Sequence, residues 1–183
     1  MKITLRGSTP PIWRRLEVYS STNLQQLHRT IQQVFGWEGY HMWVFQTPTG
    51  EYGVADRELG HRSAASAKLQ DVAPGAGDRI RYTYDFGDDW EHDLLIEDVF
   101  AAEPGVAYPR CLTGRRACPP EDCGGIWVYQ ELLEILTDPG HPEHSNRLEW
   151  LGLSSTHEFD PTTFDLAEIN QNLSKLATVR VQK

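Results

Sequence analysis

The sequence predicts one α+β domain in which helices pack on a mixed, largely antiparallel sheet. Short segments of the first hundred residues alternate apolar and polar residues at period two, which is typical of β-strands. Other segments repeat apolar residues at spacings of three and four, which is typical of helices that bury one face. The chain has 183 residues and no internal repeat or domain-sized linker, so we predict a single domain over residues 1–183.

The composition is typical of an intracellular globular protein. Hydrophobic residues make up 39% and charged residues 23%, and six tryptophans argue against disorder. No apolar run approaches the roughly 18 residues of a membrane span, and the N-terminus has no signal-peptide pattern, so we expect a cytoplasmic protein without membrane contact. The net charge is -9. Because nucleic-acid binding depends on clustered Lys and Arg, we do not expect nucleic acid as a partner.

Two strands are predicted near the N-terminus, Ile3–Leu5 and Ile12–Val18. Arg14 and Arg15 are adjacent in the second strand, so their side chains point to opposite faces. Together with Arg6 they form the only basic concentration in the chain. We interpret them as strand residues that pair with nearby carboxylates and not as a nucleic-acid patch.

A helix is predicted to begin at Thr22 and to run to Phe35. Thr22 and Gln25 have the T-x-x-Q spacing of a capping box, and Gly36 supplies the stop. Four apolar residues at spacings of three, four and three form one stripe: Leu24, Leu27, Ile31 and Val34. We expect this stripe to pack on the sheet that contains Ile12–Val18.

The middle of the chain predicts two further pairs of strands. Met42–Gln46 and Glu51–Val54 are joined by a turn, and Arg57–Ala67 is weakly patterned and predicted as a loop. Arg79–Asp85 and Asp93–Phe100 are predicted to form a hairpin.

The last third of the chain is predicted to be helical. Trp127–Leu136 forms an apolar helix, and a short helix is expected around Glu143–Leu151. Asp165 is the expected cap of a final helix, whose apolar stripe is Leu166, Ile169, Leu173 and Leu176.

Five carboxylates crowd the turn of the predicted hairpin, next to Trp90 and His92: Asp85, Asp88, Asp89, Glu91 and Asp93. Because crowded carboxylates repel one another, three interpretations are open. The turn could be solvated, with its carboxylates accepting backbone N–H groups. It could bind a divalent cation or a basic partner. His92 could also perform acid–base catalysis with one carboxylate.

Three cysteines lie in one thirteen-residue segment, at Cys111, Cys118 and Cys123. Zinc favours tetrahedral Cys and His ligands, so the three thiols with His92 form a candidate zinc site. The spacing lacks the C-x2-C knuckle of common zinc modules, so ordinary buried thiols are the other interpretation.

The loop after Cys118 combines two carboxylates with a glycine pair that leads into a helix. Glu121 and Asp122 near a helix start interact well with its dipole. A helix N-terminus could instead hold an anion, but these carboxylates would repel one, which counts against nucleotide binding.

Three segments together resemble the plasmid pRiA4b ORF-3-like family, whose members are often labelled passenger proteins of transposable elements. The segments are Pro11–Arg15 with Leu27-His28, Phe35-Gly36-Trp37 and His41; Tyr82–His92; and Cys118–Gly125 with Tyr129, Trp150 and Phe159-Asp160-Pro161. The resemblance covers about residues 2–176. It implies helices packed on a mixed sheet and implies no activity.

The leading functional prediction is a non-enzymatic accessory or protein-interaction domain associated with mobile genetic elements, with an unidentified protein as partner. Its recognition surface would consist of Asp85, Asp88, Asp89, Trp90, His92, Glu121 and Asp122. The alternative is a metal-dependent enzyme, such as a hydrolase, that uses the acidic turn and His92. DNA binding or a resolvase-like role is the third class, and the acidic composition weighs against it. Neither G-x-S-x-G nor H-E-x-x-H occurs, so nucleophilic catalysis has no support.

Overall fold

Residues 1–178 are described by a computed structural model, and residues 179–183 of the predicted domain lie outside the described part. Eight strands in this part form one sheet: β1 (Lys2–Leu5), β2 (Trp13–Glu17), β3 (Trp43–Thr47), β4 (Gly50–Gly53), β5 (Arg62–Ser63), β6 (Arg79–Tyr84), β7 (Trp90–Leu95) and β8 (Arg110–Arg115). Their order is β5-β4-β3-β6-β7-β1-β2-β8. Neighbours are antiparallel throughout, with the exception of the parallel pair β4 and β5.

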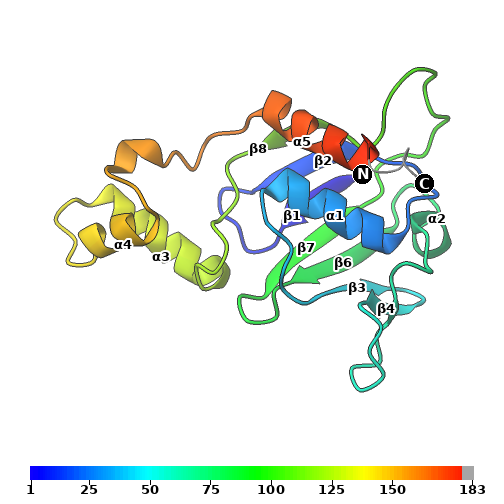
Figure 1. Cartoon of the computed structure of the whole chain (residues 1–183), viewed down its shortest axis with the longest axis horizontal. Helices are drawn as coiled ribbons and strands as arrows, with labels where there is room; N and C mark the ends of the chain where they lie inside the picture. The colour runs from blue at the N-terminus through cyan, green and yellow to red at the C-terminus, as the bar shows by residue number, and fades with distance from the viewer. Residues whose placement is uncertain (179–183) are drawn as a thin grey trace.

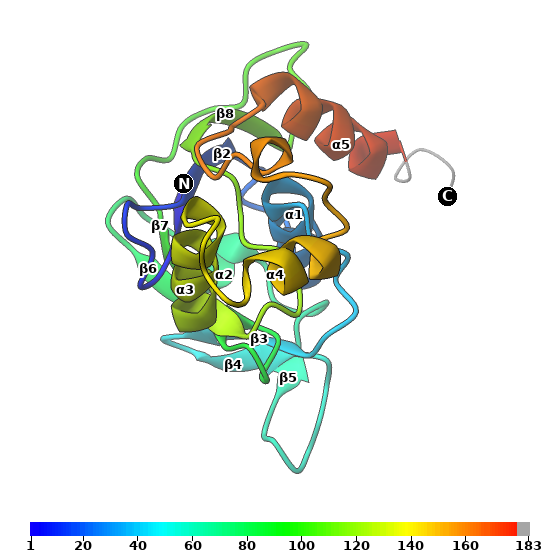
Figure 2. The same cartoon turned by 90° about the vertical axis from the view of Figure 1, so that its left-hand side faces the viewer.

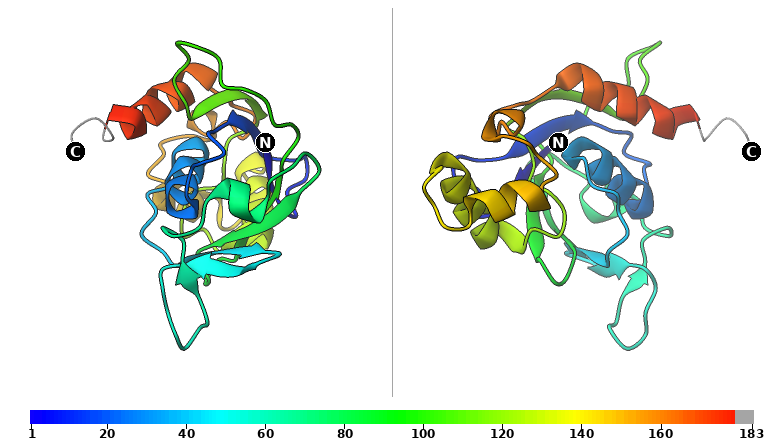
Figure 3. Two further views of the ribbon diagram at one scale, coloured as in Figure 1. Left: turned by 90° about the vertical axis from the view of Figure 1, so that its right-hand side faces the viewer. Right: turned by 60° about the vertical axis from the view of Figure 1, so that its left-hand side comes forward.

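The helices lie on one face and at one side of this sheet. They are α1 (Leu24–Phe35), α2 (Leu69–Val72), α3 (Gly125–Thr137), α4 (His144–Trp150) and α5 (Leu166–Thr178). The sheet curves around α1 (Figure 2), and α5 lies along α1 and β8 (Figure 1). α3 and α4 pack on each other beside the sheet (Figure 3). The predicted fold class, a mixed and largely antiparallel sheet with packed helices, is confirmed. None of the helices within residues 1–178 has the length and apolar character needed to cross a membrane.

The predicted stripe of α1 is buried, and its four apolar residues are at most 1% exposed. The predicted cap is wrong by one residue. Asn23, not Thr22, is the N-cap: its side chain accepts a hydrogen bond from the backbone N–H of Gln26 at 2.8 Å, and the Gln26 side chain accepts one from the Asn23 N–H. Asparagine caps as well as threonine, so the spacing alone allowed both registers. Gly36 ends the helix in the left-handed conformation, as predicted.

Arg14 and Arg15 lie on opposite faces of β2, as predicted, but only one of them pairs with a carboxylate. Arg15 binds Glu97 with two hydrogen bonds of 2.8 Å at the surface. Arg14 is 3% exposed, and its guanidinium donates to four backbone carbonyls and to the sulfur of Cys118. One of these carbonyls belongs to Val34, in the last turn of α1, where the helix dipole favours a cation. Arg14 therefore joins α1 to the end of β8.

Several element bounds differ from the predicted ones. β7 begins at Trp90 and not at Asp93, so the hairpin turn is shorter than expected. β8 and α2 were not predicted, because Arg110–Arg115 has no clear alternation and α2 has only four residues. β5 was not predicted either, because this two-residue strand lies within Arg57–Ala67, the segment predicted as a loop. The remaining predicted strands and helices are present with bounds shifted by one or two residues.

Candidate functional site

Two of the segments singled out in the sequence meet in space. The carboxylate of Asp88, in the turn between β6 and β7, accepts a 2.9 Å hydrogen bond from the backbone N–H of Gly124, the N-cap of α3. Gly125 has a φ of +82°, and a Cβ atom on it would lie 2.4 Å from the carbonyl oxygen of Asp88. Only glycine fits there. The glycine pair thus allows the turn and the loop before α3 to touch.

A third segment, between α1 and β3, completes this junction. The indole N–H of Trp37 donates to the carbonyl of Pro119 at 3.0 Å, and the backbone N–H of Glu38 donates to the carboxylate of Glu121 at 2.7 Å. The other oxygen of Glu121 accepts a hydrogen bond from the hydroxyl of Tyr84 at the end of β6. Both oxygens of Glu121 are therefore used to hold the three segments together. We call the meeting place of residues 37–42, 85–89 and 119–125 the junction.

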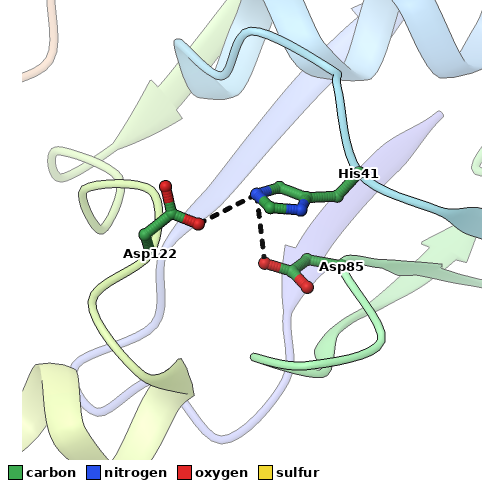
Figure 4. Close-up of side chains that lie close together, drawn as sticks. All are labelled: His41, Asp85 and Asp122. Carbon is green, nitrogen blue, oxygen red and sulfur yellow. Dashed lines mark hydrogen bonds and ion pairs between the residues drawn. The ribbon is translucent and has the colours of Figure 1, made fainter.

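One histidine and two aspartates lie at the centre of the junction (Figure 4). Nε2 of His41 is 2.9 Å from Oδ1 of Asp122 and 3.5 Å from Oδ2 of Asp85. All three ligand atoms lie within 4.8 Å of one another. Within residues 1–178 this is the only set of three or more His, Cys, Asp or Glu side chains with such spacing.

Asp85 is a buried carboxylate that is held in position by its own turn. The residue is 7% exposed and has a φ of +54°, which is rare outside glycine. Oδ1 accepts hydrogen bonds from the backbone N–H groups of Gly87, at 2.9 Å, and Asp88, at 3.4 Å. Oδ2 accepts no hydrogen bond from any residue in the range 1–178 and points toward His41. The turn therefore fixes the Asp85 carboxylate with Oδ2 directed at Nε2 of His41.

Asp122 is exposed but is also oriented. It has a φ of +58°, and its Oδ2 accepts a 2.8 Å hydrogen bond from the hydroxyl of Tyr40. This bond, together with the charges of Asp122, Glu121 and Glu38, raises the pKa of Tyr40 to about 12. Among the described residues, no Lys or Arg forms an ion pair with Asp85, Asp122 or Glu121. The junction is thus strongly negative.

The three central side chains have the chemistry of a metal site. One imidazole nitrogen and two carboxylate oxygens are ligands that Zn²⁺ and Mn²⁺ accept. In each carboxylate the oxygen that does not face the site accepts a hydrogen bond, from the hydroxyl of Tyr40 in Asp122 and from the N–H of Gly87 in Asp85. Such bonds orient the carboxylates, as is usual for metal ligands. Three protein ligands would leave at least one coordination position open for water or a substrate.

The other residues of the predicted acidic turn have separate roles. Asp88 caps α3, and Asp89 is exposed. Glu91 pairs with Arg6 and Arg81, and Asp93 lies near Arg6. Trp90 is 1% exposed and belongs to the core, so it is no part of a recognition surface.

The structure does not place His92 at the turn. Its side chain is 0% exposed, and its ring packs against Phe35, Trp37 and Tyr82. Neither ring nitrogen has a hydrogen-bond partner within residues 1–178, and burial lowers the pKa of His92 to about 3. His92 points into the core because it shares the buried face of β7 with Trp90 and Leu94, so it cannot act with the carboxylates of the turn.

The expected grouping of Cys111, Cys118 and Cys123 with His92 is also not formed. No three of these four side chains come within 4.8 Å of one another. Cys111 is on β8, Cys118 accepts the hydrogen bond from Arg14, and Cys123 is a buried residue of the loop before α3. Burial raises the pKa of all three thiols, to about 11 for Cys111 and about 12 for the other two, which disfavours the thiolate that binds zinc.

His41 is the functional candidate that the sequence did not reveal. Nothing in the spacing of His41, Asp85 and Asp122 indicates that they meet. The one signal was indirect. All three residues lie in the segments that carry the family resemblance.

Comparisons with known proteins agree with that resemblance. Residues 1–168 match the family described as plasmid pRiA4b ORF-3-like protein. An uncharacterized protein, y4hQ of Sinorhizobium fredii, is 34% identical over 189 residues, which cover 100% of this chain and 94% of that protein. The crystal structure of MM3350, a protein of unknown function from Methanosarcina mazei Go1, is similar with a TM-score of 0.80 and 38% identity. That match covers 90% of this chain and 93% of MM3350.

Proposed function

This chain belongs to the plasmid pRiA4b ORF-3-like family, and we propose that it binds a divalent metal ion at the junction, with His41, Asp85 and Asp122 as the ligands. The observation that carries the proposal is the convergence of these three side chains from three distant parts of the chain. Asp85 adds a second argument, because two backbone N–H groups hold its Oδ1 while its Oδ2 is directed at His41. A cation bound by the three side chains would offset the charge of the two carboxylates.

The chemistry of such a site is that of a Lewis acid. A metal ion with three protein ligands and an open position can lower the pKa of a bound water or polarise a carbonyl oxygen. We therefore propose a metal-dependent hydrolytic activity for the junction. His41 replaces His92 in this role, and zinc, first expected at the thiols, is proposed for the His and Asp ligands instead.

The second candidate function is an accessory domain of mobile elements that binds a protein partner. It is favoured by exposed apolar side chains next to the metal ligands, since Tyr40 is 59% and Phe86 is 45% exposed. Exposed aromatic residues of this kind are typical of interaction surfaces. This candidate uses the same junction but requires no reaction.

Metal uptake tests the proposal. Protein purified without an affinity metal is titrated with Zn²⁺ and with Mn²⁺ by calorimetry, and bound metal is counted by elemental analysis. We expect about one equivalent, and at least about tenfold weaker binding for His41→Ala, Asp85→Asn and Asp122→Asn. Binding should also weaken as the pH falls, because protons compete for the ligands.

Two control variants sharpen the result. Asp89→Asn removes an exposed carboxylate from the same turn and should leave metal binding within about twofold. Cys118→Ser should also leave the metal content unchanged. Absence of binding to the wild type, or equal binding by the ligand variants when circular dichroism shows that they are folded, would contradict the proposal.

A further inference from the structure

The charges around the proposed metal site restrict what can bind there. Six carboxylates belong to the junction: Glu38, Asp85, Asp88, Asp89, Glu121 and Asp122. Within the described part of the chain, no Lys or Arg forms an ion pair with any of them, and His41 is their only basic contact. A divalent ion would neutralise two of the six negative charges, so the loaded site would remain negative.

This charge distribution argues against a phosphate-containing ligand. Sites that bind phosphate groups use Lys, Arg or helix N-termini in addition to metal ions. The N-terminus of α3 does face the junction, but the carboxylate of Asp88 already occupies it through the Gly124 N–H. An anionic ligand would therefore meet uncompensated negative charge at every side of the metal.

Exposed apolar residues of the junction indicate which side chains a ligand would present to it. Tyr40 and Met42 flank His41 in the chain, Phe86 follows Asp85, and these three side chains are 59%, 41% and 45% exposed. An exposed aromatic ring beside carboxylates suits a Lys or Arg side chain, because the cation can contact the ring face while it pairs with a carboxylate. An apolar side chain of the ligand could cover Met42.

From these observations we infer that the junction binds a basic polypeptide segment, with Lys or Arg next to an apolar or aromatic residue. The inference extends the proposed metal site and names the class of its ligand. The peptide backbone would approach the open coordination position, where its carbonyl groups are suitable ligands for a metal ion. Basic side chains would pair with Glu38 and Asp89 at the edge of the junction, since these are exposed and have no ion-pair partner in residues 1–178.

The test compares three probes on the same protein sample. Zinc-loaded protein, with its zinc content measured by elemental analysis, is titrated by calorimetry with acetyl-Arg-Phe-Arg-amide, acetyl-Glu-Phe-Glu-amide and inorganic phosphate. We expect the basic peptide to bind at least about tenfold more tightly than the acidic peptide, and phosphate to show no measurable binding. The basic peptide should bind less tightly as salt is raised.

Charge variants at the edge of the junction provide the matched control. The double variant Glu38→Gln, Asp89→Asn should weaken binding of the basic peptide by about fivefold while it keeps its zinc. Asp98→Asn with Glu168→Gln makes the same change in charge on other parts of the molecule and should leave peptide binding unchanged. Equal losses in both double variants would show a non-specific charge effect and would overturn the inference.

The outcomes separate this inference from the metal proposal. Zinc uptake with no binding of the basic peptide, or with phosphate binding as tightly, overturns the inference and leaves the metal site intact. Binding of the basic peptide by protein that takes up no zinc supports the inference and overturns the metal site. Failure of both zinc and peptide to bind overturns both.

Discussion

His41 and His92 lie near the same end of the sheet, yet their surroundings give them opposite properties. Both rings lie beside tyrosines of β6. The ring centroid of His41 is 5.7 Å from that of Tyr84, and the ring centroid of His92 is 5.5 Å from that of Tyr82. His41 is partly exposed and faces two carboxylates. His92 is fully buried, and its ring packs against those of Phe35, Trp37 and Tyr82.

The difference shows that solvent and partners, not the residue type, decide what a histidine can do. A partly exposed imidazole beside two carboxylates can bind a metal ion or a proton. A buried imidazole without a partner is held neutral, since burial penalises its charged form. The junction therefore has its carboxylates near the surface, whereas His92 lies among buried aromatic rings.

The largest expected effect comes from placing the same charge at both positions. His92→Asp should cost at least about 4 kcal/mol in the free energy of unfolding, because the carboxylate would be buried among apolar rings. His41→Asp should cost less than about 2 kcal/mol, since water reaches the junction. Urea unfolding of the two variants measures both costs. Similar costs at both positions would contradict the difference in burial between the two histidines.

The next largest effect concerns α1, the helix that contacts His92 and precedes His41 in the chain. Phe35 of this helix packs against His92, and the chain continues from the helix end to His41. Leu27 is 0% exposed, so Leu27→Ala should cost roughly 2–5 kcal/mol. A denaturant titration checks the value. A decrease in the free energy of unfolding of less than about 1 kcal/mol would mean that the helix does not pack as described.

Much of the fold was predictable because its elements have strong periodic patterns. The predicted stripe of α1 is buried, and in β6 the apolar residues Ile80, Tyr82 and Tyr84, spaced by two, are buried as well. β8 could not be found in this way, because its central residues Leu112, Thr113 and Gly114 have no alternation of apolar and polar types. Long-range pairing with β2 forms this strand.

The candidate site was predictable only in part. Asp85 and Asp122 were both expected in a binding surface, and the structure brings them together. The wrong histidine was paired with them, because the second hairpin strand was predicted to begin at Asp93. A strand that begins at Trp90 places His92 on the buried face by alternation. The position of His41 depends on loop geometry, which residue spacing does not encode.

Arg14 and Arg15 offer a similar comparison within one strand, with a somewhat smaller effect. Arg14→Lys should cost about 3 kcal/mol, because one ammonium cannot reach the carbonyls of Val34 and Arg116 together and leaves buried acceptors without donors. Arg15→Lys should change stability by less than about 1 kcal/mol, since its pair with Glu97 is exposed. Thermal unfolding of both variants measures their loss of stability. Equal costs would contradict the role assigned to the buried guanidinium.

The smallest effect at neutral pH is expected for His92→Phe, and it grows as the pH falls. At pH 7 the substitution replaces a buried ring that has no polar partner with an apolar one, so stability should change by less than about 1 kcal/mol. In the folded protein burial lowers the pKa of His92 to about 3 from its usual 6.5. Between these two values the unfolded chain binds the extra proton, so the free energy of unfolding falls with falling pH. This histidine contributes a slope of about 1.4 kcal/mol per pH unit well below pH 6.5. His92→Phe should remove that slope, and the variant should become the more stable protein at pH 5. Urea unfolding at pH 7, 6 and 5 measures the difference, and parallel pH profiles for the two proteins would show that His92 is not held neutral by the core.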